Sequence, residues 1–243
     1  MSTAFSDDAA LDAIPAATDR LLETLRHLSD DAMRAPSRCT DWTRGHVATH
    51  VARNGDGLVN LLTWARTGTE TPMYPSREVR NADIAAGAGR ASLDIETDVD
   101  ASAERFLAAC VDVPEHALGA VVRLGSGRGV SAADIPWIRL LEVEIHHVDL
   151  DAGYGFDQTP TWVLTRLLTE AQAKFAERAA TGGQGLEAEL VAEDAGARWT
   201  FGEAPGVTVR GLLPDLVAWV TGRGDGTRLQ TSGGALPRVP TWA

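Results

Sequence analysis

The 243-residue sequence predicts an α+β protein: a four-helix bundle over residues 1–155, followed by a smaller C-terminal α+β domain over residues 156–243 with a short antiparallel sheet. Three observations predict this division. Apolar residues recur at helical spacing through the first 150 residues, short runs that alternate apolar and polar residues begin after residue 185, and Gly153-Tyr154-Gly155 separates the two regions. A chain of this length can form two domains, since domains have roughly 100–200 residues.

Four long antiparallel helices are expected in the first region, as in other helix bundles. Apolar residues at helical spacing place them around residues 21–28, 43–64, 99–111 and 131–150. Pro15 should start or kink the first helix, and Thr43 is the expected N-cap of the second. A short helix is expected over residues 77–86, and the glycine-rich residues 119–130 are expected to form a hairpin-like connection.

The second region is expected to begin with a helix from Pro160 to about residue 180, with Thr159 as its N-cap. Alternating apolar and polar residues predict three strands, over residues 186–191, 198–201 and 207–210. A last helix is expected over residues 212–221. Residues 222–243 are rich in glycine and proline, which predicts a loop.

The charge balance limits the classes of partner. Acidic residues outnumber lysine and arginine by 34 to 22, which gives a formal charge of −12. Nucleic acids and anionic membranes bind basic surfaces, so neither is an expected partner. No stretch reaches the ~18 apolar residues of a membrane span, and the first eight residues lack the basic and apolar regions of a signal peptide. Nothing in the sequence indicates an obligate protein partner.

The cysteine content indicates a reducing compartment. Cys39 and Cys110 are the two cysteines of the sequence, and they form no C-x-x-C motif or disulfide framework. We therefore expect a cytoplasmic protein with reduced thiols. Both cysteines are expected to be small buried hydrophobic residues.

Four of the six histidines fall in two short helical segments, residues 42–50 and 142–150. Glu142 and His146 are four residues apart, so they share a helix face and can bind one metal ion. His50, on the apolar stripe of its own helix, can complete the set across the bundle. Two nitrogens and one carboxylate leave a coordination position open, which is typical of a catalytic zinc site.

Spacing alone leaves other assignments open. Glu144 and His147 also share a face, and His46 lies four residues before His50. Adjacent residues differ by about 100° around a helix, so His146 and His147 cannot both face one metal. Their helix is apolar nearly all round, so the sequence does not show which histidine points inward. The same histidines can also be core residues or members of ion pairs on helix surfaces, with no metal bound.

Several segments fit a family pattern. Residues 42–52 read W-T-x-x-H-x-x-x-H-x-A, and residues 142–150 read E-V-x-x-H-x-V-D-L. Further matching segments are W-A-x-T-G-x-E-T-P-M-Y over residues 64–74, R-N-x-x-I over residues 80–84, Gly222-Arg223-Gly224 and Pro240-Thr241-Trp242. In these segments, nearly from end to end, the chain resembles the mycothiol-dependent maleylpyruvate isomerase family, which is related to the DinB-like four-helix-bundle metalloenzymes.

The resemblance implies a ligand set. A zinc ion, or another divalent metal, would be held by His50, Glu142 and His146. The other candidates, His46, Glu144 and His147, would then have structural roles.

The resemblance also implies roles outside the metal ligands. Arg223 would take part in catalysis and Arg80 would bind substrate, with the C-terminal domain closing the active-site cleft. Asp149, three residues after His146, could hydrogen-bond that ligand or could be an exposed carboxylate at the helix end.

The implied reaction converts maleylpyruvate to fumarylpyruvate in gentisate degradation, a cis-to-trans change about a double bond. A thiolate that adds to the alkene makes this bond single, and rotation and loss of the thiolate complete the change. The thiol would come from mycothiol, and the metal would ionise it, since a free thiol has a pKa of roughly 8.5. The partners would be a small dicarboxylate substrate and this thiol. The alternative is a mycothiol S-transferase that acts on other electrophiles.

Overall fold

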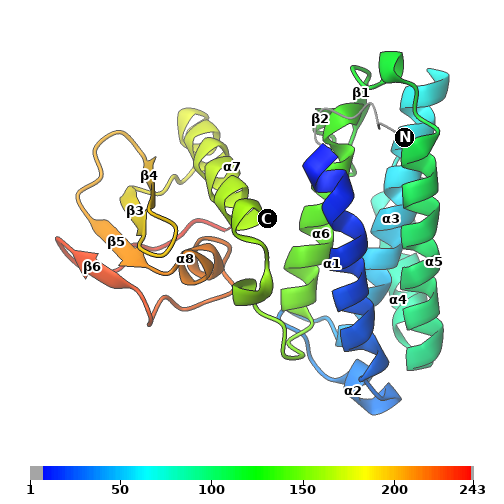
Figure 1. Ribbon diagram of the computed structural model, residues 1–243, viewed down its shortest axis with the longest axis horizontal. Helices are drawn as coiled ribbons and strands as arrows, with labels where there is room; N and C mark the ends of the chain where they lie inside the picture. Colours follow the sequence, from blue (N-terminus) through cyan, green and yellow to red (C-terminus); the bar gives the residue numbers. More distant parts are fainter. Residues whose placement is uncertain (1–7, 242–243) are drawn as a thin grey trace. The chain divides into compact units, whose positions relative to one another are not determined.

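The computed structural model describes residues 8–241 and divides the chain into two units, Met1–Tyr154 and Gly155–Ala243 (Figure 1). The described residues do not include residues 1–7, which form most of the segment that lacks signal-peptide features. They also do not include Trp242, the last residue of the family pattern. Among residues 8–241, no helix is both long and apolar enough to cross a membrane.

Four long helices pack together in the first unit, which confirms the expected bundle (Figure 1). They are α1 (Asp8–Arg26), α3 (Arg44–Thr67), α5 (Ser92–Val111) and α6 (Ile135–Asp149), and the shorter α2 (Asp30–Arg34) and α4 (Arg77–Ala88) accompany them. Pro15 lies inside α1 rather than at its start. Each helix buries aliphatic or aromatic side chains such as Leu21, Leu58, Phe106 and Leu140. Burial of each such side chain contributes about 1.5–3 kcal/mol.

A partly buried polar network joins α1 to α6. Arg20 Nη2 donates to Glu144 Oε1 over 2.7 Å, and Thr24 Oγ1 lies 2.7 Å from His147 Nε2. Tyr154 donates its hydroxyl to Glu144 Oε2 over 2.5 Å and stacks on the His147 ring with 3.6 Å between centroids. Residue numbers rise together along the two helices in these contacts, so α1 and α6 run parallel.

α3 and α5 are also parallel neighbours. Two ion pairs, each 2.6 Å long, join these helices: Arg53 of α3 with Asp98 of α5, and Asp56 of α3 with Arg105 of α5. The residue numbers increase in the same direction on both helices, as in a parallel pair. α4 makes this direction possible because it returns the chain to the start of α3. There, a Cβ on Gly45 would collide with the carbonyl oxygen of the last residue of α4. The expectation of four antiparallel helices was therefore wrong for these two pairs.

The start of α3 agrees with the sequence pattern. The Thr43 hydroxyl accepts a hydrogen bond from the His46 backbone N–H over 3.3 Å, and the Thr43 N–H donates to His46 Nδ1 over 3.3 Å. This reciprocal capping box satisfies two backbone donors at the helix start. Thr43 is thus confirmed as the N-cap of the helix that carries His50.

The connection between α5 and α6 also contains the expected hairpin. Strands β1 (Val121–Arg123) and β2 (Gly129–Ser131) pair antiparallel, with Val122 opposite Val130. α5 begins at Ser92 rather than near residue 99. The early part of this helix has acidic residues between its apolar ones, which weakens the helical pattern.

In its described part, the second unit combines two α-helices with a four-stranded sheet in the order β4-β3-β5-β6. The elements are α7 (Thr161–Ala180), β3 (Ala188–Ala192), β4 (Ala197–Phe201), β5 (Thr208–Gly211), α8 (Leu213–Val220) and β6 (Gln230–Ser232). Phe175 of α7 packs near Phe201 of β4, with ring centroids 6.1 Å apart. The expected α+β fold is thus confirmed.

Three details of this unit differ from the expectation. The sheet is mixed rather than antiparallel, because β3 and β5 pair in parallel. β6 forms within the expected loop, and its exposed side chains show no apolar alternation that would predict a strand. Pro160 rather than Thr159 is the N-cap of α7.

His147 leads to a prediction about stability. Burial, together with the Arg20 charge, lowers the pKa of His147 from 6.5 to about 3. Between these values the unfolded chain binds a proton that the folded chain does not, so the free energy of unfolding falls as pH decreases. We expect His147 to account for a loss of about 2 kcal/mol between pH 7 and pH 5 in metal-free protein, measured by urea unfolding.

The matched variant is His147→Gln, which keeps a polar group toward Thr24. Its free energy of unfolding should depend less steeply on pH over the same interval. Equal slopes for the two proteins would contradict the assigned pKa shift.

Candidate metal centre

Three side chains meet where α3 packs against α6. His50 Nε2 lies 3.1 Å from His146 Nε2 and 3.2 Å from Glu142 Oε2, and His146 Nε2 lies 3.5 Å from the same oxygen. Glu142 and His146 are one turn apart on α6, and α3 presents His50 to both. The structure thus brings together the three residues that the family resemblance implies as ligands, as a group that can hold one metal ion.

The donor set fits a divalent metal. Glu142 Oε2 is buried and accepts no hydrogen bond of good geometry within residues 8–241, although two imidazole nitrogens lie beside it. A buried carboxylate oxygen without a hydrogen bond is unfavourable. An ion bound by all three atoms would compensate for this burial, and two imidazoles with one carboxylate are typical zinc ligands.

The three groups have different charges near pH 7 in the absence of metal. Burial lowers the pKa of His50 to about 4, so this imidazole is neutral. Burial opposes ionisation of Glu142, but His146 and His50 outweigh it and hold the pKa of this carboxyl well below its usual value. Burial also opposes protonation of His146, but Asp149, Cys39 and Glu142 raise its pKa well above 6.5. A metal must therefore displace a proton from His146.

Asp149 fixes the orientation of the His146 ring. His146 Nδ1 lies 3.0 Å from Asp149 Oδ2, and Asp149 is only 1% exposed. The alternative of an exposed helix-end carboxylate was therefore wrong. Donation from Nδ1 to a carboxylate leaves the Nε2 lone pair free for a metal and makes the nitrogen more basic.

Arg80 and two aromatic side chains lie beside the three potential ligands. Arg80 Nη2 is 3.2 Å from His50 Nδ1, and its Cζ lies 6.0 Å from the Trp42 ring centroid and 5.7 Å from that of Tyr74. The Trp42 ring also meets His50 edge-on, with centroids 5.5 Å apart. A cation is thus held by aromatic faces at the candidate centre.

Arg139 is a candidate that the sequence analysis missed. It is fully buried one turn before Glu142, and Nη1 donates to Val51 O over 2.7 Å and to Asn54 Oδ1 over 3.1 Å. Its Nε and Nη2 make no hydrogen bond within the described chain. Burial lowers its pKa to about 10, so the guanidinium stays charged near pH 7 and favours the Glu142 carboxylate. A lone arginine within the apolar residues 135–141 was the available signal.

The other sequence candidates lie elsewhere. His46 belongs to the capping box of α3, and Glu144 and His147 belong to the network between α1 and α6. These contacts give each a structural role. Arg223 lies in the second unit on the turn after α8, where its Nη1 donates to Thr221 O over 2.8 Å.

Comparisons with known proteins agree on one family. The family model described as the mycothiol maleylpyruvate isomerase N-terminal domain matches residues 14–151. A crystal structure of the mycothiol-dependent maleylpyruvate isomerase is 32% identical, with a TM-score of 0.87 and 100% of both chains covered. A structure of a histidine-to-alanine mutant of that enzyme is also 32% identical over 100% of both chains, with a TM-score of 0.86. No curated protein matches the sequence.

We expect one divalent ion per chain at His50, Glu142 and His146. His146→Ala should abolish stoichiometric binding, because even loss of a group that only orients a ligand weakens affinity roughly 10- to 100-fold. The matched control is His147→Gln, which changes the adjacent side chain that faces α1 and should keep the metal. Elemental analysis after dialysis measures both. Metal retained by His146→Ala and lost by His147→Gln would contradict the assignment.

We also expect Asp149→Asn to weaken metal affinity roughly 10- to 100-fold, because His146 loses its carboxylate partner. The control is Asp151→Asn, which changes an exposed carboxylate two residues away that pairs with Arg38. Competition with a chromophoric chelator measures the two affinities. Equal affinities would show that Asp149 does not orient the ligand.

Proposed function

Because the chain belongs to the mycothiol-dependent maleylpyruvate isomerase family, we propose that it converts maleylpyruvate to fumarylpyruvate, with mycothiol and a zinc ion as cofactors. The observation that carries this proposal is the convergence of His50, Glu142 and His146 beside the Arg80 guanidinium. A metal ion held by these three ligands would activate a thiol cofactor, and the Arg80 guanidinium would bind a carboxylate of a dicarboxylate substrate.

When bound, zinc and mycothiol would together supply a thiolate, the nucleophile that adds to the conjugated double bond of the substrate. The protein controls the charge around it. His50 and His146 are neutral as ligands and Glu142 is ionised, so the three side chains together contribute one negative charge. A divalent ion held by these three side chains would keep a net positive charge, which would favour the thiolate form of the thiol.

Arg80 is the proposed substrate-binding residue. A neutral His50 that coordinates through Nε2 keeps its proton on Nδ1, so Nδ1 can no longer accept a hydrogen bond from Arg80. The guanidinium then has donors to offer a substrate carboxylate, through two parallel charge-assisted bonds. Its surroundings support this role, since its Cζ lies near the Trp42 and Tyr74 rings and its Nη1 donates to Asn81 Oδ1 over 3.0 Å, which together orient the cation.

Tyr74 supplies a neutral donor in the same place. Burial and the Glu142 charge raise the pKa of its phenol above the usual value, although Arg80 and Arg139 act in the opposite direction. The hydroxyl therefore keeps its proton near pH 7. It can donate a hydrogen bond to a substrate oxygen that gains negative charge when the thiolate adds.

Arg223 is the proposed catalytic residue of the second unit, and the proposed role of that unit is to close the site over the substrate. The turn that carries Arg223 is well defined. Gly222 has a φ of 75°, which glycine adopts without strain, and the Arg223 N–H donates to Ala218 O over 2.7 Å. A guanidinium held in this way suits a substrate carboxylate or the developing enolate.

Two free cysteines support a cytoplasmic site of action. Neither Cys39 nor Cys110 forms a disulfide. Reduced thiols are typical of cytosolic proteins, and a low-molecular-weight thiol cofactor stays reduced in the same compartment.

Turnover of purified maleylpyruvate, measured with and without mycothiol, tests the proposed function. We expect fumarylpyruvate to form only when both mycothiol and metal are present. A protein that binds metal and conjugates mycothiol to other electrophiles, but leaves maleylpyruvate unchanged, would be the S-transferase of the alternative.

Arg80→Lys keeps the charge but loses the planar fork, so KM for maleylpyruvate should rise about 10- to 100-fold with metal content unchanged. Arg77→Lys, an exposed position on the same helix, is the matched control and should show wild-type kinetics. Steady-state kinetics at saturating mycothiol measure both variants. An unchanged KM in Arg80→Lys would remove Arg80 from the substrate site.

Arg223→Lys should keep the metal and the fold but lower kcat on the order of 10²-fold, the usual effect of removing one oxyanion-stabilising group. Arg228→Lys, which changes an exposed arginine of the same unit paired with Asp215, serves as the control. The two kcat values are compared under identical conditions. Wild-type turnover by Arg223→Lys would exclude a catalytic role for Arg223.

A further inference from the structure

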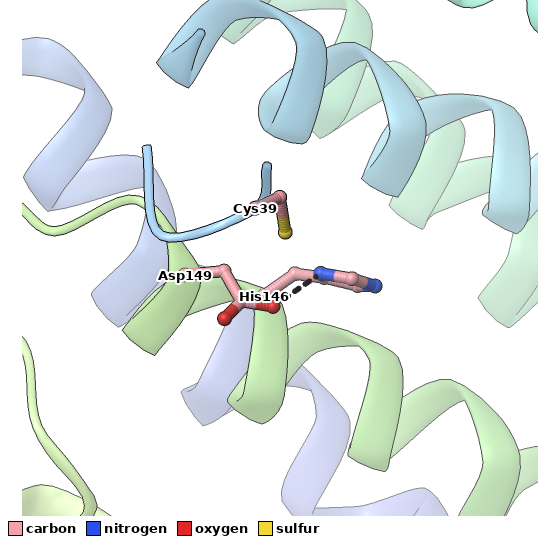
Figure 2. A group of neighbouring side chains, drawn as sticks. All are labelled: Cys39, His146 and Asp149. Carbon is pink, nitrogen blue, oxygen red and sulfur yellow. Dashed lines mark hydrogen bonds and ion pairs between the residues drawn. The ribbon is translucent and has the colours of Figure 1, made fainter. Parts of the chain in front are cut away.

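A second cluster of potential ligands includes the other nitrogen of His146 (Figure 2). Cys39 Sγ, a nitrogen of His146 and a carboxylate oxygen of Asp149 all lie within 4.8 Å of one another. In Figure 2 the Cys39 thiol points from its loop toward the other two side chains. His146 Nε2 faces Glu142, whereas His146 Nδ1 faces Asp149. One imidazole therefore belongs to two clusters of ligating atoms.

The loop that carries Cys39 is attached to the end of α6. The Arg38 backbone N–H donates to Asp149 O over 2.9 Å. Ser37 Oγ accepts from the Cys39 N–H over 3.2 Å and donates to Trp42 O over 2.8 Å. These bonds hold the backbone of Cys39 in place near His146 and Asp149, so the three groups are arranged before any ion binds.

The two cysteines of the chain have different environments. Cys110 is 2% exposed inside α5, and burial raises its pKa to about 12, as expected for a cysteine that acts as a small apolar residue. Cys39 is half-buried and lies beside an imidazole and a carboxylate. The expectation of a buried hydrophobic residue was therefore wrong for Cys39, because its loop turns the thiol toward polar partners.

We propose that Cys39, His146 and Asp149 form a second binding site, for a soft or borderline divalent cation of the zinc class. Thiolate, imidazole and carboxylate are the three kinds of protein ligand that zinc takes, and three of them leave one position open. The site shares His146 with the proposed isomerase centre but is otherwise built from different atoms.

The shared imidazole couples the two sites. When His146 binds the first ion through Nε2, Nδ1 keeps its proton and donates it to Asp149. A second ion replaces this proton and that of the Cys39 thiol, and both protons leave to solvent. It also removes the Asp149 carboxylate from His146. Because it must displace two protons and lies beside the first cation, the second ion binds more weakly than the first.

Titration of the full-length metal-free protein with cobalt(II) tests the second site. A thiolate-to-cobalt charge-transfer band appears in the near ultraviolet only when a cysteine sulfur is a ligand. We expect the first equivalent to bind without this band and the second equivalent to produce it. A band already present at the first equivalent would support the second site but contradict the prediction that it binds metal more weakly than the first site.

Three variants assign the band. Cys39→Ser should bind one equivalent without the band, and Cys110→Ser should behave as wild type. His50→Ala removes a ligand of the proposed isomerase centre only, so this variant should keep the band. The second site can therefore be tested even if the proposed isomerase centre is wrong. Absence of the band from reduced wild-type protein at every ratio, or its persistence in Cys39→Ser, would overturn the proposal.

Discussion

The packing of α3 against α6 is the contact on which the rest of the structure depends. It buries Glu142 Oε2 between two imidazole nitrogens, and a buried carboxylate is tolerated only where positive charge or hydrogen bonds compensate for lost hydration. Arg139 supplies fixed positive charge from the core one turn earlier on α6, and a bound metal would supply more. The same contact sets the positions of Arg80 and Asp149, because each touches a histidine of the cluster.

Two adjacent histidines on α6 have different roles: His147 is structural, and His146 is a candidate metal ligand. His147 faces α1 and stacks on Tyr154, where burial keeps it neutral and bonded to Thr24. His146, about 100° around the helix, faces α3 and carries carboxylates near both ring nitrogens. The packing of α1 on one side of α6 and of α3 on the other therefore decides which histidine can bind metal. This choice comes from tertiary structure, which explains why spacing alone left it open.

Much of the fold followed from local patterns. The Thr43 cap, the bundle helices and the strands β3 to β5 were predictable because apolar periodicity and capping chemistry are local. The directions of the helices were not, because they depend on how α4 returns the chain. β6 could not be predicted from the sequence because its three residues are exposed and polar and pair with β5 only through the backbone. Arg139 and Cys39 were missed for a related reason: each acquires its role from groups more than 80 residues away in the sequence.

X-ray absorption spectroscopy of the zinc-loaded Cys39→Ser protein tests the central claim most directly, since this variant removes the Cys39 sulfur that lies beside His146. Without thiol, we expect only nitrogen and oxygen neighbours of the zinc at about 2.0–2.2 Å, including the outer-shell pattern of two imidazoles. Addition of mycothiol should introduce one sulfur neighbour at about 2.3 Å. A spectrum that shows fewer than two imidazoles, or that does not change when mycothiol is added, would contradict the assignment of His50, Glu142 and His146 as the centre that binds the thiol.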